Sequence, residues 1–190
     1  HAASILEAHP HLDVLGIDQD TDALSAAIER LKAQRKWLRI SHRRFNEFDD
    51  ALVDHQITKI SGALFDLGVS SPQLDNADRG FGFRDDGPLD MRMDTRSGVT
   101  AADWIAVASE AQIAEVIKTY GEERFARRMA SAIVKVRAET PISRTKQLAS
   151  IVAEANPRWE PNKHPATRAF QAIRIYINRE LEDLELALDP

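Results

Sequence analysis

Hydrophobic positions follow two alternating periods over the first 66 residues of the chain. Apolar residues at helical spacing predict helices at 2–8, 21–36 and 51–56. Short apolar runs predict buried strands at 13–18 and 60–66, and residues 38–42 are a further strand candidate. Because helices and strands alternate, we expect an α/β fold in which crossover helices join the strands of a parallel sheet.

The pattern changes after residue 66. Residues 67–98 are rich in Gly, Pro, Asp and Ser, and a loop of this length in a compact domain is usually functional. Its apolar side chains predict that the loop is ordered and packed; they are Phe81, Phe83, Leu89, Met91 and Met93. From residue 100 onward the helical period returns, with helices predicted at 102–106, 110–119, 122–138, 145–155 and 166–188.

The two ends of the chain differ from a complete doubly wound sheet, which begins with a strand and a Gly-rich turn. Here a predicted helix starts directly after His1, and the chain ends on a helix after only three predicted strands. We therefore expect segments of the fold to be missing from both ends.

Composition narrows the class of protein. There is no cysteine, 43% of the residues are hydrophobic, and no apolar run approaches the roughly 20 residues that span a bilayer. These values predict a soluble, cytoplasmic protein without contact to a membrane. No histidine has metal-ligand spacing with carboxylates, so we expect no metal site.

Charge is distributed unevenly along the sequence. The net charge is −5, but residues 118–180 hold 13 Lys/Arg against 6 Asp/Glu. A cationic segment of this kind can contact phosphates while the rest of the protein stays acidic. The alternative is a solvated helix face rich in arginine.

Two acidic residues end predicted strands. Asp18 follows the strand at 13–18, and Asp66 follows the strand at 60–66. The carboxyl ends of parallel strands line the ligand crevice of open α/β sheets, where a carboxylate binds ribose hydroxyls. Asp18 could instead cap the next helix, although Asp20 or Thr21 is better placed to do so, and Asp66 could merely form an Asx-turn.

Five motifs, taken together and in order, closely resemble the RsmH (MraW) family. They are Asp66-Leu-Gly-Val-Ser-Ser-Pro-Gln-Leu-Asp75, Arg79-Gly-Phe, Asp86-Gly-Pro-Leu-Asp-Met-Arg-Met-Asp94, Tyr120-Gly-Glu-Glu-Arg-Phe-Ala-Arg-Arg128 and His164-Pro-Ala-Thr-Arg168. The resemblance covers essentially the whole chain. It implies an enzyme that uses S-adenosylmethionine to methylate the N4 amino group of a cytidine in the decoding centre of 16S rRNA.

The resemblance also implies a domain organisation: a Rossmann-like, class I methyltransferase core with an inserted all-helical domain. The core's first part would span residues 1–99, the helical insertion for substrate recognition 100–162, and a return helix of the core 163–190. The glycines of the family's Gly-Gly-His loop and its final strands are not in this chain, and Gly82 stands where many relatives have Ser.

Site residues follow from the same resemblance. The family's cofactor contacts fall on His1, Asp18, Phe45, Asp66 and Gln73. We assign the contact with the target amino group to Asp66 and the Ser70-Ser71-Pro72 turn. The candidates for binding RNA phosphates or the extruded base are Arg79, Arg92, Arg124, Arg127 and Arg128.

Two other functions stay open at this stage. A dinucleotide-dependent enzyme would use the same strand-end acid, Asp18. A non-catalytic RNA-binding or assembly fragment would use the basic segment without methyl transfer. Small-subunit 16S rRNA is the expected partner, and the oligomeric state stays open, a homodimer included.

Overall fold

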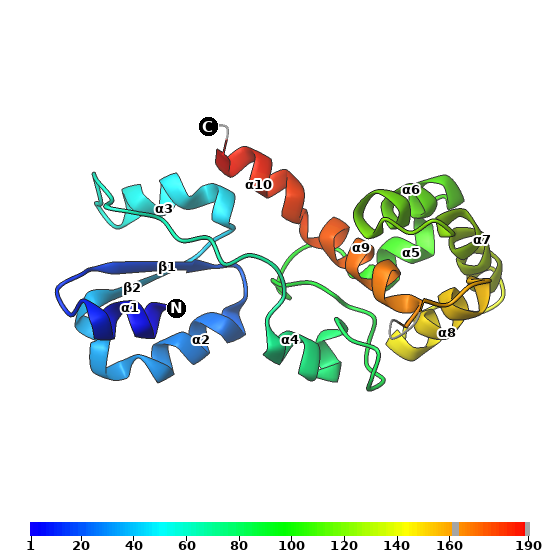
Figure 1. The fold of residues 1–190 in the computed structure, drawn as a ribbon, viewed down its shortest axis with the longest axis horizontal. Coiled ribbons are helices and arrows are strands. Elements are labelled where there is room, and N and C mark those ends of the chain that lie inside the picture. Colours follow the sequence, from blue (N-terminus) through cyan, green and yellow to red (C-terminus); the bar gives the residue numbers. More distant parts are fainter. Residues whose placement is uncertain (161–163, 189–190) are drawn as a thin grey trace. The chain divides into compact units, whose positions relative to one another are not determined.

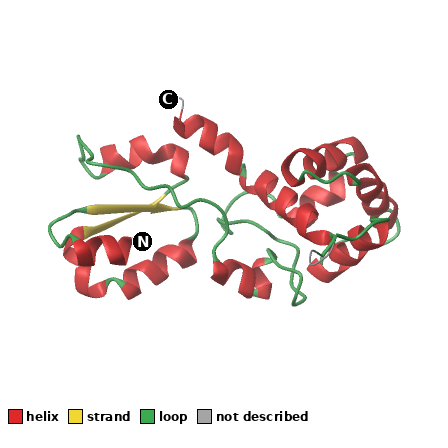
Figure 2. Ribbon diagram, viewed as in Figure 1, coloured by secondary structure: helices red, strands yellow, loops and turns green. Residues whose placement is uncertain are grey.

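A computed structural model describes residues 1–160 and 164–188, and these divide into two compact units. The first, which we call the sheet unit, contains His1–Asp66, Met93–Thr95 and the residues from Leu181 onward. The second, the helical unit, contains Leu67–Arg92 and Arg96–Glu180. Figures 1 and 2 show the elements of each unit.

The sheet unit is a small Rossmann-like α/β core. Strand β1 (Val14–Asp18) pairs in parallel with β2 (Leu38–His42), in a register that places Asp18 opposite His42. Helix α2 (Thr21–Arg30) and the 3₁₀ turn η1 (Lys32–Trp37) make the crossover between them. Both strands agree with the sequence-based prediction, whereas the predicted helix at 21–36 ends as an α-helix at Arg30.

Three further helices belong to this unit. Figure 1 shows α1 (Ala2–Ala8) and α2 on one side of the strands and α3 (Phe48–Asp54) on the other. The 3₁₀ turn η2 (Phe45–Glu47) precedes α3. Most of α10 (Glu180–Leu188) also lies in the sheet unit, where the buried carboxylate of Asp183 binds Arg44, with Oδ2 2.7 Å from Nε.

The prediction of a buried strand at 60–66 is wrong. This segment has no regular secondary structure, and its apolar side chains are exposed, with Leu64 at 64% and Phe65 at 44%. A strand requires a hydrogen-bonded neighbour, and the sheet in the described part of the chain contains only β1 and β2. An apolar run in a sequence carries no information about such a neighbour.

The helical unit is built on five helices. They are α5 (Ala101–Val107), α6 (Glu110–Gly121), α7 (Ala126–Arg137), α8 (Thr145–Ala155) and α9 (Ala166–Asn178). Thr100 and Ser109 start α5 and α6 with capping boxes. Helices α6 and α9 approach closely at Gly121, where an added Cβ would lie 2.5 Å from the carbonyl oxygen of Arg168.

The predicted helix at 166–188 is interrupted. Arg179 adopts a left-handed conformation with φ of 54°, so α9 ends at Asn178 and α10 begins at Glu180. The side chain of Asn178 is buried and donates hydrogen bonds to the carbonyl oxygens of Met91 and Arg174. These bonds hold the last turn of α9 against the long loop.

The loop at 67–98 is ordered and packed, as predicted. It contains a short helix, α4 (Ser71–Asp75), and a 3₁₀ turn, η3 (Ala77–Arg79). Leu89 and Met91 are fully buried in the core of the helical unit. The backbone of Leu89 donates to the carbonyl oxygen of Ser143, and Thr145 donates to that of Gly87. No helix in the described residues is long and apolar enough to cross a membrane.

Candidate functional site

The carboxyl edge of the two-stranded sheet carries the first group of polar side chains. Asp18 ends β1, and its Oδ1 accepts a hydrogen bond of 2.8 Å from the backbone N–H of Asp20. Burial of the carboxylate raises the pKa of Asp18, although this hydrogen bond opposes the shift. The side chain of Asp20 caps α2 by accepting a hydrogen bond from the N–H of Asp22. Asp18 is therefore not the N-cap of this helix.

His42 ends β2 directly beside Asp18. Its Nε2 lies 2.8 Å from the carbonyl oxygen of Gln19 and 3.6 Å from Oδ2 of Asp94. The Gln19 side chain donates in turn to the sulfur of Met93. His42 was not among the predicted site residues, and its position at the end of a predicted strand was the signal that could have placed it here.

His1 and Asp66 lie in contact. The Nδ1 atom of His1 is 2.9 Å from Oδ2 of Asp66, and both side chains are largely exposed. The ring of Phe45 packs edge-on against Phe65, with centroids 6.5 Å apart. Of the five predicted cofactor residues, His1, Asp18, Phe45 and Asp66 thus belong to the sheet unit, and two of them touch.

Gln73 and the predicted amine-binding turn belong to the helical unit. Gln73 is buried, and its Oε1 accepts a hydrogen bond of 2.8 Å from the N–H of Ser70 at the start of α4. Gln73 therefore helps to shape the turn. Ser70, Ser71 and Pro72 are exposed.

Two of the five predicted RNA-binding arginines have structural partners. Arg79 is 8% exposed, and its guanidinium donates to the carbonyl oxygen of Arg92. Arg92 forms a bidentate pair with Asp90, at 2.7 and 2.8 Å. Burial alone would raise the pKa of Asp90, but the hydrogen bonds and charge of Arg92 bring it below its ordinary value. In this arrangement both arginines brace the long loop.

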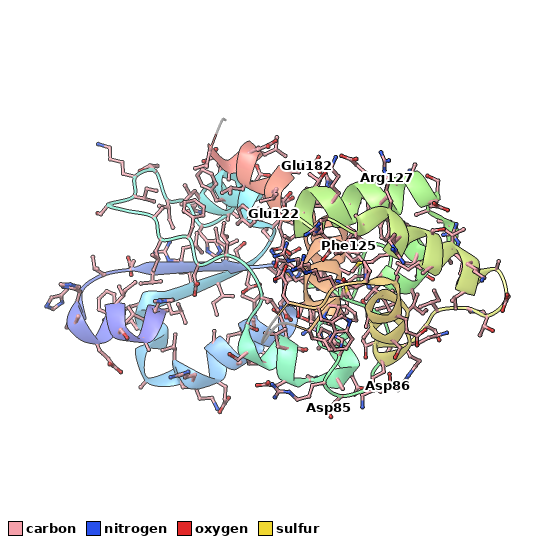
Figure 3. The ribbon with its side chains drawn as sticks, turned by 45° about the vertical axis from the view of Figure 1, so that its right-hand side comes forward. Asp85, Asp86, Glu122, Phe125, Arg127 and Glu182 are labelled. Atoms are coloured by element: carbon pink, nitrogen blue, oxygen red, sulfur yellow. The ribbon has the colours of Figure 1, made fainter. Side chains whose placement is uncertain are left out.

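The remaining three arginines are exposed. Arg124 stacks over the ring of Phe125, 4.8 Å from its centroid. Arg127 and Arg128 lie in the first turn of α7, which Phe125 precedes (Figure 3). The junction of α6 and α7 therefore presents three guanidinium groups to solvent, which suits contact with phosphates.

Comparison with known proteins decides the family. The model of the MraW methylase family matches residues 1–190, the whole chain. The chain belongs to this family. It is also 55% identical over 177 residues to the ribosomal RNA small subunit methyltransferase H of Idiomarina loihiensis, covering 93% of this chain and 56% of that protein.

Other family members give the same result. The protein of the same name from Alteromonas mediterranea is 53% identical over 190 residues, covering 99% of this chain and 60% of the relative. The one from Neisseria meningitidis serogroup B is 55% identical over 171 residues, covering 90% and 52%. The chain thus spans a little over half the length of these family members.

Proposed function

We propose that the protein methylates the N4 amino group of a cytidine in the decoding centre of 16S rRNA, with S-adenosylmethionine as methyl donor. The observation that carries the proposal is the family match over all 190 residues. The relatives are named as ribosomal RNA small subunit methyltransferases, and a donor site on the sheet unit is consistent with that name.

The residues of the sheet unit fit the methyl donor. The carboxylate of Asp18 has two oxygens: Oδ1 accepts a hydrogen bond from the backbone N–H of Asp20, and Oδ2 is the second. This second oxygen can accept from ribose hydroxyls, as strand-end carboxylates do in nucleotide-binding sheets. Phe45 offers an aromatic face for an adenine ring, and the exposed carboxylate of Asp66 can bind a cationic group. S-adenosylmethionine would supply an electrophilic methyl group.

The target amine determines what the protein must do. The lone pair on N4 of cytosine is delocalised into the ring, so the amine is a poor nucleophile that must be held in line at about 3–3.5 Å. Positive charge builds on N4 as the methyl group moves, and a nearby carboxylate or carbonyl stabilises that charge. We assign this role to Asp66 and the exposed Ser70-Ser71-Pro72 turn.

The RNA would be held by the exposed arginines of the helical unit. Arg124, Arg127 and Arg128 follow one another at the α6–α7 junction, where single-stranded RNA can meet their charges. Arg79 and Arg92 support this role indirectly by bracing the loop.

Equilibrium binding separates this proposal from a dinucleotide-dependent enzyme. Calorimetric titration of the chain should detect S-adenosylmethionine but not a nicotinamide dinucleotide, and Asp18→Ala should weaken the binding at least tenfold. Binding of the dinucleotide in place of S-adenosylmethionine would contradict the proposal. The relative from Idiomarina loihiensis, with the matching substitution, is a suitable control of full family length.

A further inference from the structure

The helical unit contains two neighbouring hollows that the proposed methyl-transfer chemistry does not use. The first encloses about 150 Å³, less than the roughly 300–1,000 Å³ of typical small-molecule sites, so it suits a single ring system. Phe125, Arg158 and Arg168 are among its lining residues. The second lies along α8, where Lys146 and Ser150 contribute to its lining.

Trp159 and His164 line both hollows and so form the wall between them. Their ring centroids are 5.6 Å apart, and His164 lies 4.8 Å from Phe83. Phe83 in turn packs against the buried ring of Phe170, also at 4.8 Å. A row of four rings therefore runs from the core to the surface, and it ends at Trp159, which is 60% exposed.

A hydrogen bond from the backbone orients the His164 ring of this wall. Nδ1 of His164 accepts a hydrogen bond from the N–H of Ala166 at the start of α9. In the neutral ring the proton is then on Nε2, which makes this atom a donor. An exposed aromatic ring supported in this way is typical of stacking surfaces for bases.

The polar groups around the first hollow match a nucleotide. Arg124, Arg158 and Arg168 supply guanidinium groups, one of which pairs with Glu160. Glu123 is only 5% exposed, and its Oε1 accepts from the N–H of Phe125. A buried carboxylate in a ring-sized hollow can accept hydrogen bonds from the amino group of a base such as cytosine.

We propose that the two hollows bind two successive unpaired nucleotides of an RNA strand, whose bases stack on opposite faces of the Trp159–His164 wall. Flat rings next to guanidinium groups suit bases joined by phosphates, and stacking of this kind tolerates many sequences. In the first hollow, Glu123 favours a base that carries an exocyclic amino group. The inference rests on the proposed function only in taking RNA as the partner, because none of the residues assigned to methyl transfer lines either hollow.

Fluorescence anisotropy with labelled single-stranded heptamers tests the wall. Trp159→Ala should weaken binding of a mixed-sequence RNA heptamer about tenfold, whereas Trp159→Phe should stay within about threefold of the parent protein. Val107→Ala, at an exposed apolar residue of α5, is the matched control and should change nothing. Because Trp159 is exposed, the thermal unfolding midpoint should stay unchanged. The proposal would be overturned if Trp159→Ala bound the single-stranded RNA as tightly as the parent protein. It would also be overturned if the substitution weakened binding of a duplex of the same sequence by an equal factor.

Base identity tests the first hollow separately. Glu123→Gln should lower the preference for oligocytidine over oligouridine heptamers at least threefold, because the amide no longer offers two acceptor oxygens to an amino group. An unchanged preference would refute the assigned role of Glu123. These assays contain no methyl donor. Failure to bind S-adenosylmethionine would therefore contradict the proposed function but not this inference. Failure of the RNA-binding tests would contradict this inference but not the proposed function.

Discussion

The pair formed by Arg44 and Asp183 is an ionic contact of the sheet unit with one fully buried partner. Asp183 is 1% exposed, and its Oδ2 lies 2.7 Å from Nε and 2.6 Å from Nη2 of Arg44. Replacing Arg44 with Met would leave a carboxylate buried without its cation. Removing one partner of a buried pair typically costs about 3–5 kcal/mol, and because the Arg44 side chain is 31% exposed we expect about 2–3 kcal/mol here.

Urea unfolding followed by circular dichroism measures this cost. With a slope of about 1–3 kcal/mol per molar urea, the midpoint of the sheet unit should fall by about 0.7–3 M. Arg43→Met is a matched control one residue away, since Arg43 pairs with the exposed residue Asp54 and its loss should change little. The double variant Arg44→Met with Asp183→Leu should recover most of the stability. Equal midpoints for Arg43→Met and Arg44→Met would refute this reasoning.

Three further predictions concern packing, pH and charge. Gly121→Ala should destabilise the helical unit by about 1–3 kcal/mol, because α6 and α9 would have to separate, and a parent-like thermal midpoint would contradict this. Burial raises the pKa of Asp18, so the folded protein binds this proton more tightly than the unfolded chain, and stability falls as the pH rises from 3.8 through the raised value. Asp18→Asn should therefore be more stable than the parent at neutral pH and lose that advantage below pH 3.8; an advantage independent of pH would argue against it. Joint replacement of Arg124, Arg127 and Arg128 with Ala should lower the salt dependence of RNA binding by about two units of slope, and an unchanged slope would show that they form only a solvated face.

Local patterns in the sequence predicted both strands of the sheet correctly. The predicted strand at 38–42 has the bounds of β2, Leu38–His42, and a carboxylate at the end of β1 was expected from the strand that precedes it. Asp20 or Thr21 was expected to cap α2, and Asp20 does. These features depend on residues that are close in sequence, so a single sequence contains the necessary information.

Features that depend on distant partners could not be predicted. The segment 60–66 has the composition of a buried strand but no hydrogen-bonded neighbour. Arg79 and Arg92 have the charge of RNA-binding residues, yet their nearest acceptors are protein atoms. The row of rings at the two hollows joins residues 83, 159 and 164, which no local sequence period connects.

Incorporation of labelled methyl groups from S-adenosylmethionine into small ribosomal subunits tests the central claim most directly, with nucleoside analysis to locate the methyl group. We expect N4-methylcytidine in 16S rRNA, and we expect Asp66→Ala to reduce its formation at least a hundredfold, both in this chain and at the matching position of the Idiomarina loihiensis relative. Methylation at another atom, or full activity of Asp66→Ala, would contradict the account.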